Sequence, residues 1–187
     1  MSFWEKWVAV LTKPKETFAA EKANASLKEG AIHLAIGYGI YGLITGILMA
    51  FAPSLFPGIP GMAAGVTAII TTPISYTLFG VAATAILTVF MMAIAKLLSG
   101  PGGFAQMYYL GALYIAPMAI LQVLTFVPTV GSLVMLLIGI YMLYLKTLMI
   151  KEVHGFSTGK AVAVWLIPSA ILLIAVLAII LLRSAAG

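Results

Sequence analysis

The sequence predicts an all-α integral membrane protein with five transmembrane helices and a short amphipathic segment at its N-terminus. Hydrophobic residues make up 63% of the 187 residues, charged residues only 8%, and the mean hydropathy is +1.16. Soluble domains are about 45–50% apolar and about 25% charged. A chain with so few charges cannot cover its surface in water. Apolar runs of about 20 residues, the length that crosses a bilayer, recur along it.

Residues 1–30 are predicted to form a cytoplasmic amphipathic segment that precedes the membrane domain, residues 31–187. We expect a first interfacial helix with its large apolar side chains on one face. These side chains are Phe3, Trp4, Trp7, Val8 and Leu11. Pro14 is expected to start a second, polar helix that continues to about Gly30. The pair is interpreted as solvated helices, with a dedicated partner-docking surface as the alternative.

Five apolar stretches are long enough to cross a membrane. The expected spans are about 31–52, 74–98, 104–126, 131–150 and 161–182. The start of the second span depends on Pro73, which divides a long apolar stretch. Pro73 is expected to start a helix capped by Thr71 or Thr72. Residues 62–73 are then interpreted as an interfacial or re-entrant segment.

The distribution of lysine predicts the orientation of the spans. The N-terminal segment holds five lysines, Lys96 marks the second turn, and Lys146, Lys151 and Lys160 mark the last one. The two intervening loops hold none, so we expect the N-terminus in the cytoplasm and the C-terminus outside. The net charge of +5 is therefore expected to face anionic headgroups rather than nucleic acid. In a prokaryote this location would be the cytoplasmic membrane.

The most polar stretch of the second half, "KEVHGFSTGKA" at residues 151–161, is interpreted as a turn between two spans. Gly155 suits a left-handed residue that ends a helix, and Phe156 supplies the accompanying apolar contact. Ser157 can cap the next helix. Lys151 and Lys160 are expected at the level of headgroup phosphates, and Lys146 lies deeper but can extend toward the interface.

No pattern predicts an enzyme, a cofactor or a metal centre. One alternative is a metal site built from two histidines and two glutamates; its members would be Glu29, His33, Glu152 and His154. Both histidines fall at the predicted interface, where a polar residue is tolerated. The chain has no Cys, and no histidine or carboxylate lies at the depth of the serines within the spans to activate them.

Tyrosines concentrate in the cytoplasmic halves of the predicted spans. Those considered for a site are Tyr38, Tyr41, Tyr114, Tyr141 and Tyr144. They are interpreted as an aromatic belt with hydrogen bonds between helices. The alternative is a water-filled cavity bounded by Tyr41, Tyr114 and Tyr144, which would make the protein a small transporter or channel for an uncharged or anionic solute.

Small residues and prolines give the expected helix contacts. Gly42 and Gly46 form a small-xxx-small pair that permits close contact, within the chain or between copies. Pro117 and Pro168 interrupt spans, as prolines do in transporters with broken helices.

Four sequence elements together resemble the Yip-domain family, five-span membrane proteins first known as interactors of Ypt/Rab GTPases. They are "TKPKETF", "GPGGFAQMYYLGALYIAP", "VPTVG" and "YLKTLMIKEVHGFSTGKAVAVWLIP". The resemblance covers nearly the whole chain and implies five spans with a cytoplasmic N-terminus. Eukaryotic relatives resemble trafficking factors with a long N-terminal region that carries an Asp-Leu-Tyr-Gly-Pro element. This chain has no Asp, which argues against binding of a small GTPase and indicates a short, prokaryote-type member.

We therefore expect a non-enzymatic scaffold or membrane-organising protein. Its partners would be anionic lipid and another integral membrane protein or a second copy. The expected contact surface consists of Trp4, Trp7, Lys146, Lys151, His154 and Lys160.

Overall fold

The computed structural model describes residues 1–56 and 65–186, and these residues form helices and no strand. Two short helices, α1 (Phe3–Thr12) and α2 (Pro14–Glu21), are followed by the 3₁₀ helix η1 (Lys22–Asn24). The long helices are α3 (Leu27–Phe51), α4 (Val66–Leu97), α5 (Phe104–Leu121), α6 (Gly131–His154) and α7 (Thr158–Ala186). The 3₁₀ helices η2 (Pro53–Leu55) and η3 (Gln122–Phe126) follow α3 and α5.

Five of these helices are long and apolar enough to cross a membrane, so the prediction of five transmembrane helices is confirmed. The candidate spans are Leu27–Phe51, Val66–Leu97, Phe104–Phe126, Gly131–His154 and Thr158–Arg183. The span on α5 is the central one: 56% of its apolar stretch is buried, against 6% for the span on α7. The helix α3 packs on α4 and α5, and α6 also packs on α5.

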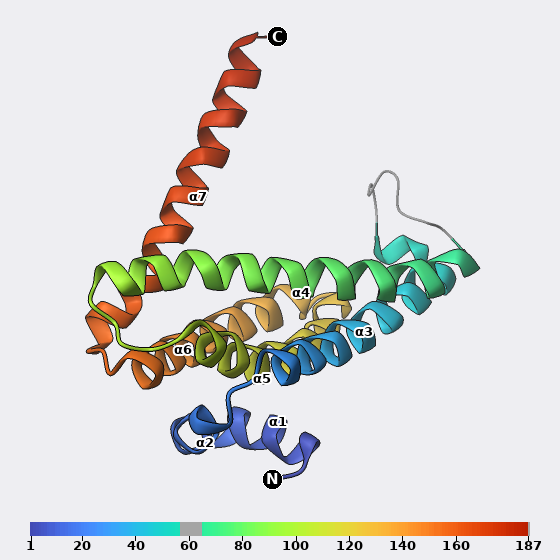
Figure 1. The fold of residues 1–187 in the computed structure, drawn as a ribbon. Helices are drawn as coiled ribbons and strands as arrows, with labels where there is room; N and C mark the ends of the chain where they lie inside the picture. Colours follow the sequence, from blue (N-terminus) through green and yellow to red (C-terminus); the bar gives the residue numbers. More distant parts are fainter. Residues whose placement is uncertain (57–64, 187) are drawn as a thin grey trace.

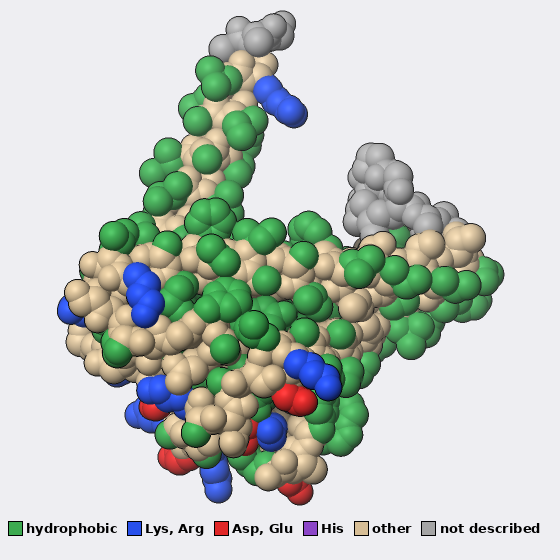
Figure 2. Space-filling view, in the orientation of Figure 1, with side chains coloured by type: hydrophobic (Ala, Val, Ile, Leu, Met, Phe, Trp, Pro, Cys, Tyr) green, Lys and Arg blue, Asp and Glu red, His purple; other side chains and the backbone are tan. Residues whose placement is uncertain are grey.

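The last helix leaves the bundle after its first turns. Ala161 and Val164 are fully buried, and α7 contacts α4 and α6. Beyond Pro168, large apolar side chains such as Leu173 and Leu181 are more than half exposed. Figure 1 shows α7 projecting away from α4, with the C-terminus at its far tip. Figure 2 shows that this projection is largely apolar, whereas most charged side chains gather near α1 and α2 and at one end of the bundle.

The prediction that Pro73 starts the second membrane helix is wrong. The helix α4 begins at Val66 and continues through Pro73, and Thr71 donates its hydroxyl to the carbonyl of Thr67 instead of capping a new helix. Proline removes one helical N–H donor, and a membrane helix tolerates this loss where side chains and neighbouring helices satisfy the freed groups. Residues 66–72 are therefore helical, and residues 62–64 lie outside the described residues.

Pro117 and Pro168 also lie inside continuous helices, so the interruption predicted at these two positions does not occur. The predicted polar helix from Pro14 to Gly30 is likewise too long. It ends at Glu21, and Ser26 then caps α3 by accepting from the N–H of Glu29. Residues 27–30 thus belong to the first span, because a serine followed three residues later by glutamate is a helix start.

Glycines allow α3 to lie against α4 within one chain. A Cβ atom at Gly42 would be 2.6 Å from the Cα of Pro73, and one at Gly46 would be 2.5 Å from the carbonyl oxygen of Ala68. Gly37 makes the corresponding approach to α5, where a Cβ would lie 2.6 Å from the Cα of Ala116. The backbones of these helices therefore touch with no side chain between them.

Candidate functional site

The N-terminal helices α1 and α2, which we call the docked pair, pack on one side of the bundle (Figure 1). Ser2 starts α1 with a capping box: it accepts from the N–H of Glu5, and the Glu5 carboxylate accepts from the N–H of Ser2. Val10 and Phe18 are fully buried and belong to the core of the membrane helices. The segment is thus an integral part of the fold.

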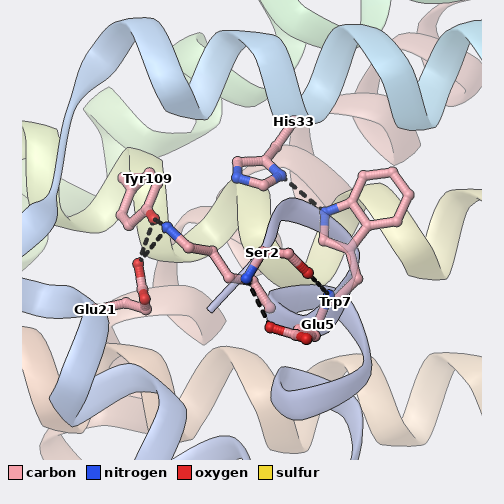
Figure 3. A network of polar contacts seen from close by, with 7 residues as sticks. Ser2, Glu5, Trp7, Glu21, His33 and Tyr109 are labelled. Carbon is pink, nitrogen blue, oxygen red and sulfur yellow. Dashed lines mark hydrogen bonds and ion pairs between the residues drawn. The ribbon is translucent and has the colours of Figure 1, made fainter.

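A buried polar network ties both helices of the docked pair to α5 (Figure 3). The Lys6 ammonium lies 2.8 Å from a carboxylate oxygen of Glu21 and 3.0 Å from the hydroxyl oxygen of Tyr109. The Tyr109 hydroxyl donates to the same Glu21 oxygen over 2.6 Å. Only 5% of the Glu21 side chain and 20% of the Lys6 side chain are exposed. Each of the three groups therefore satisfies the other two, which is the condition for burying charge.

A second contact joins α1 to α3. The indole N–H of Trp7 donates to Nδ1 of His33 over 2.8 Å, and the Phe3 ring stacks on the imidazole at 4.2 Å between centroids. Because an indole nitrogen only donates, Nδ1 must be unprotonated and the imidazole proton must lie on Nε2. Trp7 is 6% exposed, so the structure does not place it on the contact surface predicted for it. It holds α1 in place.

The apolar residues of α1 occupy two faces of the helix, whereas the sequence predicted one. Trp7 and Val10 face the bundle. Met1, Trp4 and Val8 face away from it and are 61%, 58% and 63% exposed. Glu5, Ala9, Thr12 and Lys13 lie beside them on the same face. We call Met1, Trp4 and Val8 the outer stripe.

The second polar cluster lies where the turn between α4 and α5 meets the turn between α6 and α7; we call this the basic end. His154 is 2% exposed, and its Nδ1 accepts from the N–H of Gly102 over 3.1 Å. Its Nε2 therefore carries the proton and lies 3.2 Å from the sulfur of Met107. A Cβ atom at Gly100 would lie 2.5 Å from Nδ1 of His154. The histidine thus joins the two turns. Because it is buried, it does not belong to the predicted contact surface.

The turn after α6 has the backbone conformation and the capping contacts that the sequence predicts. Gly155 adopts a left-handed conformation with φ of 66°, and its N–H donates to the carbonyl of Lys151. Ser157 accepts from the N–H of Lys160 at the start of α7, and Phe156 is buried against the ring of His154. The local prediction of this turn is confirmed.

Replacing His154 by Leu is expected to weaken the junction of the two turns. The change leaves the Gly102 N–H buried without an acceptor, which costs about 1–3 kcal/mol. We expect a lower melting temperature in detergent and faster hydrogen exchange at residues 100–103. The exposed Lys15→Gln variant is the control and should alter neither quantity. Unchanged protection of residues 100–103 in the leucine variant would show that the hydrogen bond contributes nothing to the junction.

The lysines of the predicted contact surface differ in exposure. Lys160 is exposed, and its ammonium lies 5.6 Å from the centroid of the Phe156 ring. Lys151 is half-buried and donates to the hydroxyl of Thr158 over 2.9 Å. Lys146 is also half-buried, within the span on α6. Lys151 and Lys160 therefore remain at the surface of the basic end.

The tyrosines considered as a cavity lining pack against separate neighbours. Tyr41 meets Tyr76 at 4.9 Å between ring centroids, and fully buried Tyr114 meets Phe18 of α2. Tyr144 stacks on Tyr141, whose hydroxyl donates to the carbonyl of Leu11. Tyr38 lies 3.4 Å from the hydroxyl of Thr84. The docked pair thus packs against Tyr114 and Tyr141, and the tyrosines expected to bound a cavity contact different neighbours.

No metal centre forms from the predicted histidines and glutamates in the part of the chain that the structure describes. Residues 1–56 and 65–186 contain no group of three or more His, Cys, Asp or Glu placed to hold an ion. His33 and His154 instead accept hydrogen bonds from Trp7 and Gly102.

Five apolar helices and a charged segment packed at their side define a multi-pass integral membrane protein. The chain belongs to the Yip1 domain family, whose model matches residues 8–180. The match covers nearly the whole chain, so the family resemblance seen in the sequence is confirmed. No curated protein and no solved structure matches the chain.

Proposed function

We propose that this protein is a non-enzymatic scaffold that binds another integral membrane protein through the outer stripe of α1. The observation that carries the proposal is the combination of a fixed helix with a large exposed apolar surface. Buried polar contacts through Lys6 and Trp7 hold α1, yet Trp4 and the rest of the stripe point away from the bundle. An apolar patch with polar residues at its rim is typical of an interaction site, and tryptophan is frequent among residues that dominate binding.

We further propose that the docked pair and the basic end face the cytoplasm. Nine of the ten Lys and Arg residues belong to the N-terminal segment or lie at or near the basic end, and Arg183 is the exception. Positive charge on one side of the spans is the pattern of cytoplasmic loops. The partner would therefore meet the outer stripe at the cytoplasmic surface, where Lys151 and Lys160 lie next to the leaflet.

A photocrosslinking amino acid placed at position 4 tests the proposal in native membranes. We expect irradiation to join position 4 to one discrete membrane protein, because Trp4 is 58% exposed. The matched control carries the same amino acid at position 15, an exposed position of α2 outside the outer stripe. It should not give this crosslink. Crosslinks from position 4 to lipid alone would contradict a protein partner, as would equal crosslinking from both positions.

A further inference from the structure

We propose that the basic end contains a binding site for the phosphate headgroup of an anionic phospholipid. The site consists of four lysines, which we call the basic corner. They are Lys22, Lys96, Lys151 and Lys160. This inference names a lipid ligand and does not depend on the protein partner proposed for the outer stripe.

Tertiary structure gathers the basic corner from three segments of the chain. The Lys22 ammonium donates to the carbonyl oxygen of Glu152 over 2.5 Å, although the two residues are 130 positions apart. The Lys96 ammonium donates to the carbonyl oxygen of Gly100 over 3.1 Å, and Gly100 packs against His154 and Phe156. Lys160 lies over the ring of the same Phe156. The junction of the two turns thus holds the lysines near one another.

The basic corner has little anionic compensation of its own. An ion pair joins Lys22 to Glu152 at 3.7 Å, and it is weak because both side chains are about one-third exposed. The partners described for Lys96, Lys151 and Lys160 are a carbonyl, a hydroxyl and an aromatic ring. Residues 1–30 have five lysines and four glutamates, whereas residues 31–187 have five Lys and Arg residues and one glutamate. Residues 31–187 therefore carry most of the excess positive charge, and three of their lysines belong to the basic corner.

The place of the corner fits a lipid better than a soluble anion. It lies where α4 ends, α6 ends and α7 begins, at the boundary of three membrane-spanning helices. Exposed apolar side chains continue from it along the spans: Leu97 is 80% exposed and Leu166 is 49% exposed. A phospholipid could place its phosphate among the ammonium groups and its acyl chains along this apolar surface. Basic residues between helices at this level are a recurrent arrangement for lipid headgroups.

Titration of the purified full chain in a neutral detergent with fluorescent short-chain phosphatidylglycerol tests the site. The variant combines Lys96→Gln, Lys151→Gln and Lys160→Gln. Its control combines Lys13→Gln, Lys15→Gln and Lys28→Gln, which removes the same charge from residues outside the corner. We expect affinity to fall on the order of 100-fold in the first variant and to change little in the control. Melting temperatures of both variants establish that they are folded.

Three outcomes would overturn the proposal. Equal losses in the two variants would show that binding follows net charge. Unchanged affinity in the first variant would exclude the corner. Displacement of the lipid by glycerol phosphate at the same concentration would show that the acyl chains contribute nothing and that the ligand is a free phosphate ester. Binding of phosphatidylglycerol but not phosphatidylcholine, lost only in the first variant, is the result that supports it.

Discussion

Replacing Glu21 by Gln is expected to release the docked pair from the membrane helices. The variant keeps the size of the side chain but leaves the Lys6 ammonium without an anion in a site where only 20% of that lysine side chain is exposed. Breaking a buried ion pair from one side costs about 3–5 kcal/mol, and because Lys6 is partly exposed we expect a loss of about 3 kcal/mol. Hydrogen exchange at residues 3–12 should therefore become much faster than in the unmodified protein.

The exposed Glu16→Gln variant, on the same helix, is the matched control and should leave exchange unchanged. A triple variant, Lys6→Met, Glu21→Leu and Tyr109→Phe, removes both charges together with the hydroxyl that they satisfy. It should recover most of the protection, because apolar side chains of similar volume often replace a buried ion pair without loss. Fast exchange in the triple variant as well would mean that the unpaired Lys6 charge is not the cause of the loss in the Glu21→Gln variant.

The same network predicts how docking depends on pH. Burial raises the pKa of the Glu21 carboxyl, but the Lys6 ammonium and the Tyr109 hydroxyl more than offset this and hold the pKa below its ordinary value of 4.5. A group whose pKa is lowered by folding stabilises the folded state fully above its unfolded pKa. This contribution should be lost as pH falls from about 4.5 through the folded pKa. When hydrogen exchange at residues 3–12 is measured against pH, the unmodified protein should therefore lose protection at acid pH. The Glu21→Gln variant should show no such pH-dependent loss.

Local patterns predicted the elements of the fold because each depends on residues close in sequence. Apolar runs of sufficient length predicted five membrane helices, and Gly155 with Ser157 predicted the turn between α6 and α7. The rule that proline starts a helix failed at Pro73, where α3 packs closely against α4. Tertiary packing outweighed local preference there.

The polar sites were not predicted because their members are far apart in the sequence. Tyr109 is 103 residues from Lys6 and 88 from Glu21, and Trp7 is 26 from His33. A lone lysine in a short amphipathic helix, or a lone histidine near the start of a membrane span, gives no indication of such a partner. The arrangement of α1 explains why Trp7 and Trp4 differ: one face of the helix is needed for docking, and only the other remains available for contacts.

Replacing Gly46 by Leu is expected to separate α3 from α4 and destabilise the bundle. The Cβ atom alone would lie 2.5 Å from the carbonyl oxygen of Ala68, and the obstacle is helix backbone that cannot rotate away. Overpacking of this kind costs about 1–3 kcal/mol, and more where the neighbour cannot move. We therefore expect the free energy of unfolding to fall by about 3 kcal/mol. Gly139→Leu on α6 is the matched control, since a Cβ there meets nothing within 4 Å.

A disulfide between α3 and α4 can report this separation directly, because the chain has no cysteine of its own. A Cβ atom at Gly39 would lie 3.5 Å from the hydroxyl oxygen of Thr77, so cysteines at these two positions are close enough to be joined. Oxidation should form the bond readily in the cysteine pair and in the pair with Gly139→Leu, but poorly in the pair with Gly46→Leu. Equal oxidation in all three proteins would mean that α3 and α4 accommodate the leucine. The close approach at Gly46 would then be dispensable for their packing.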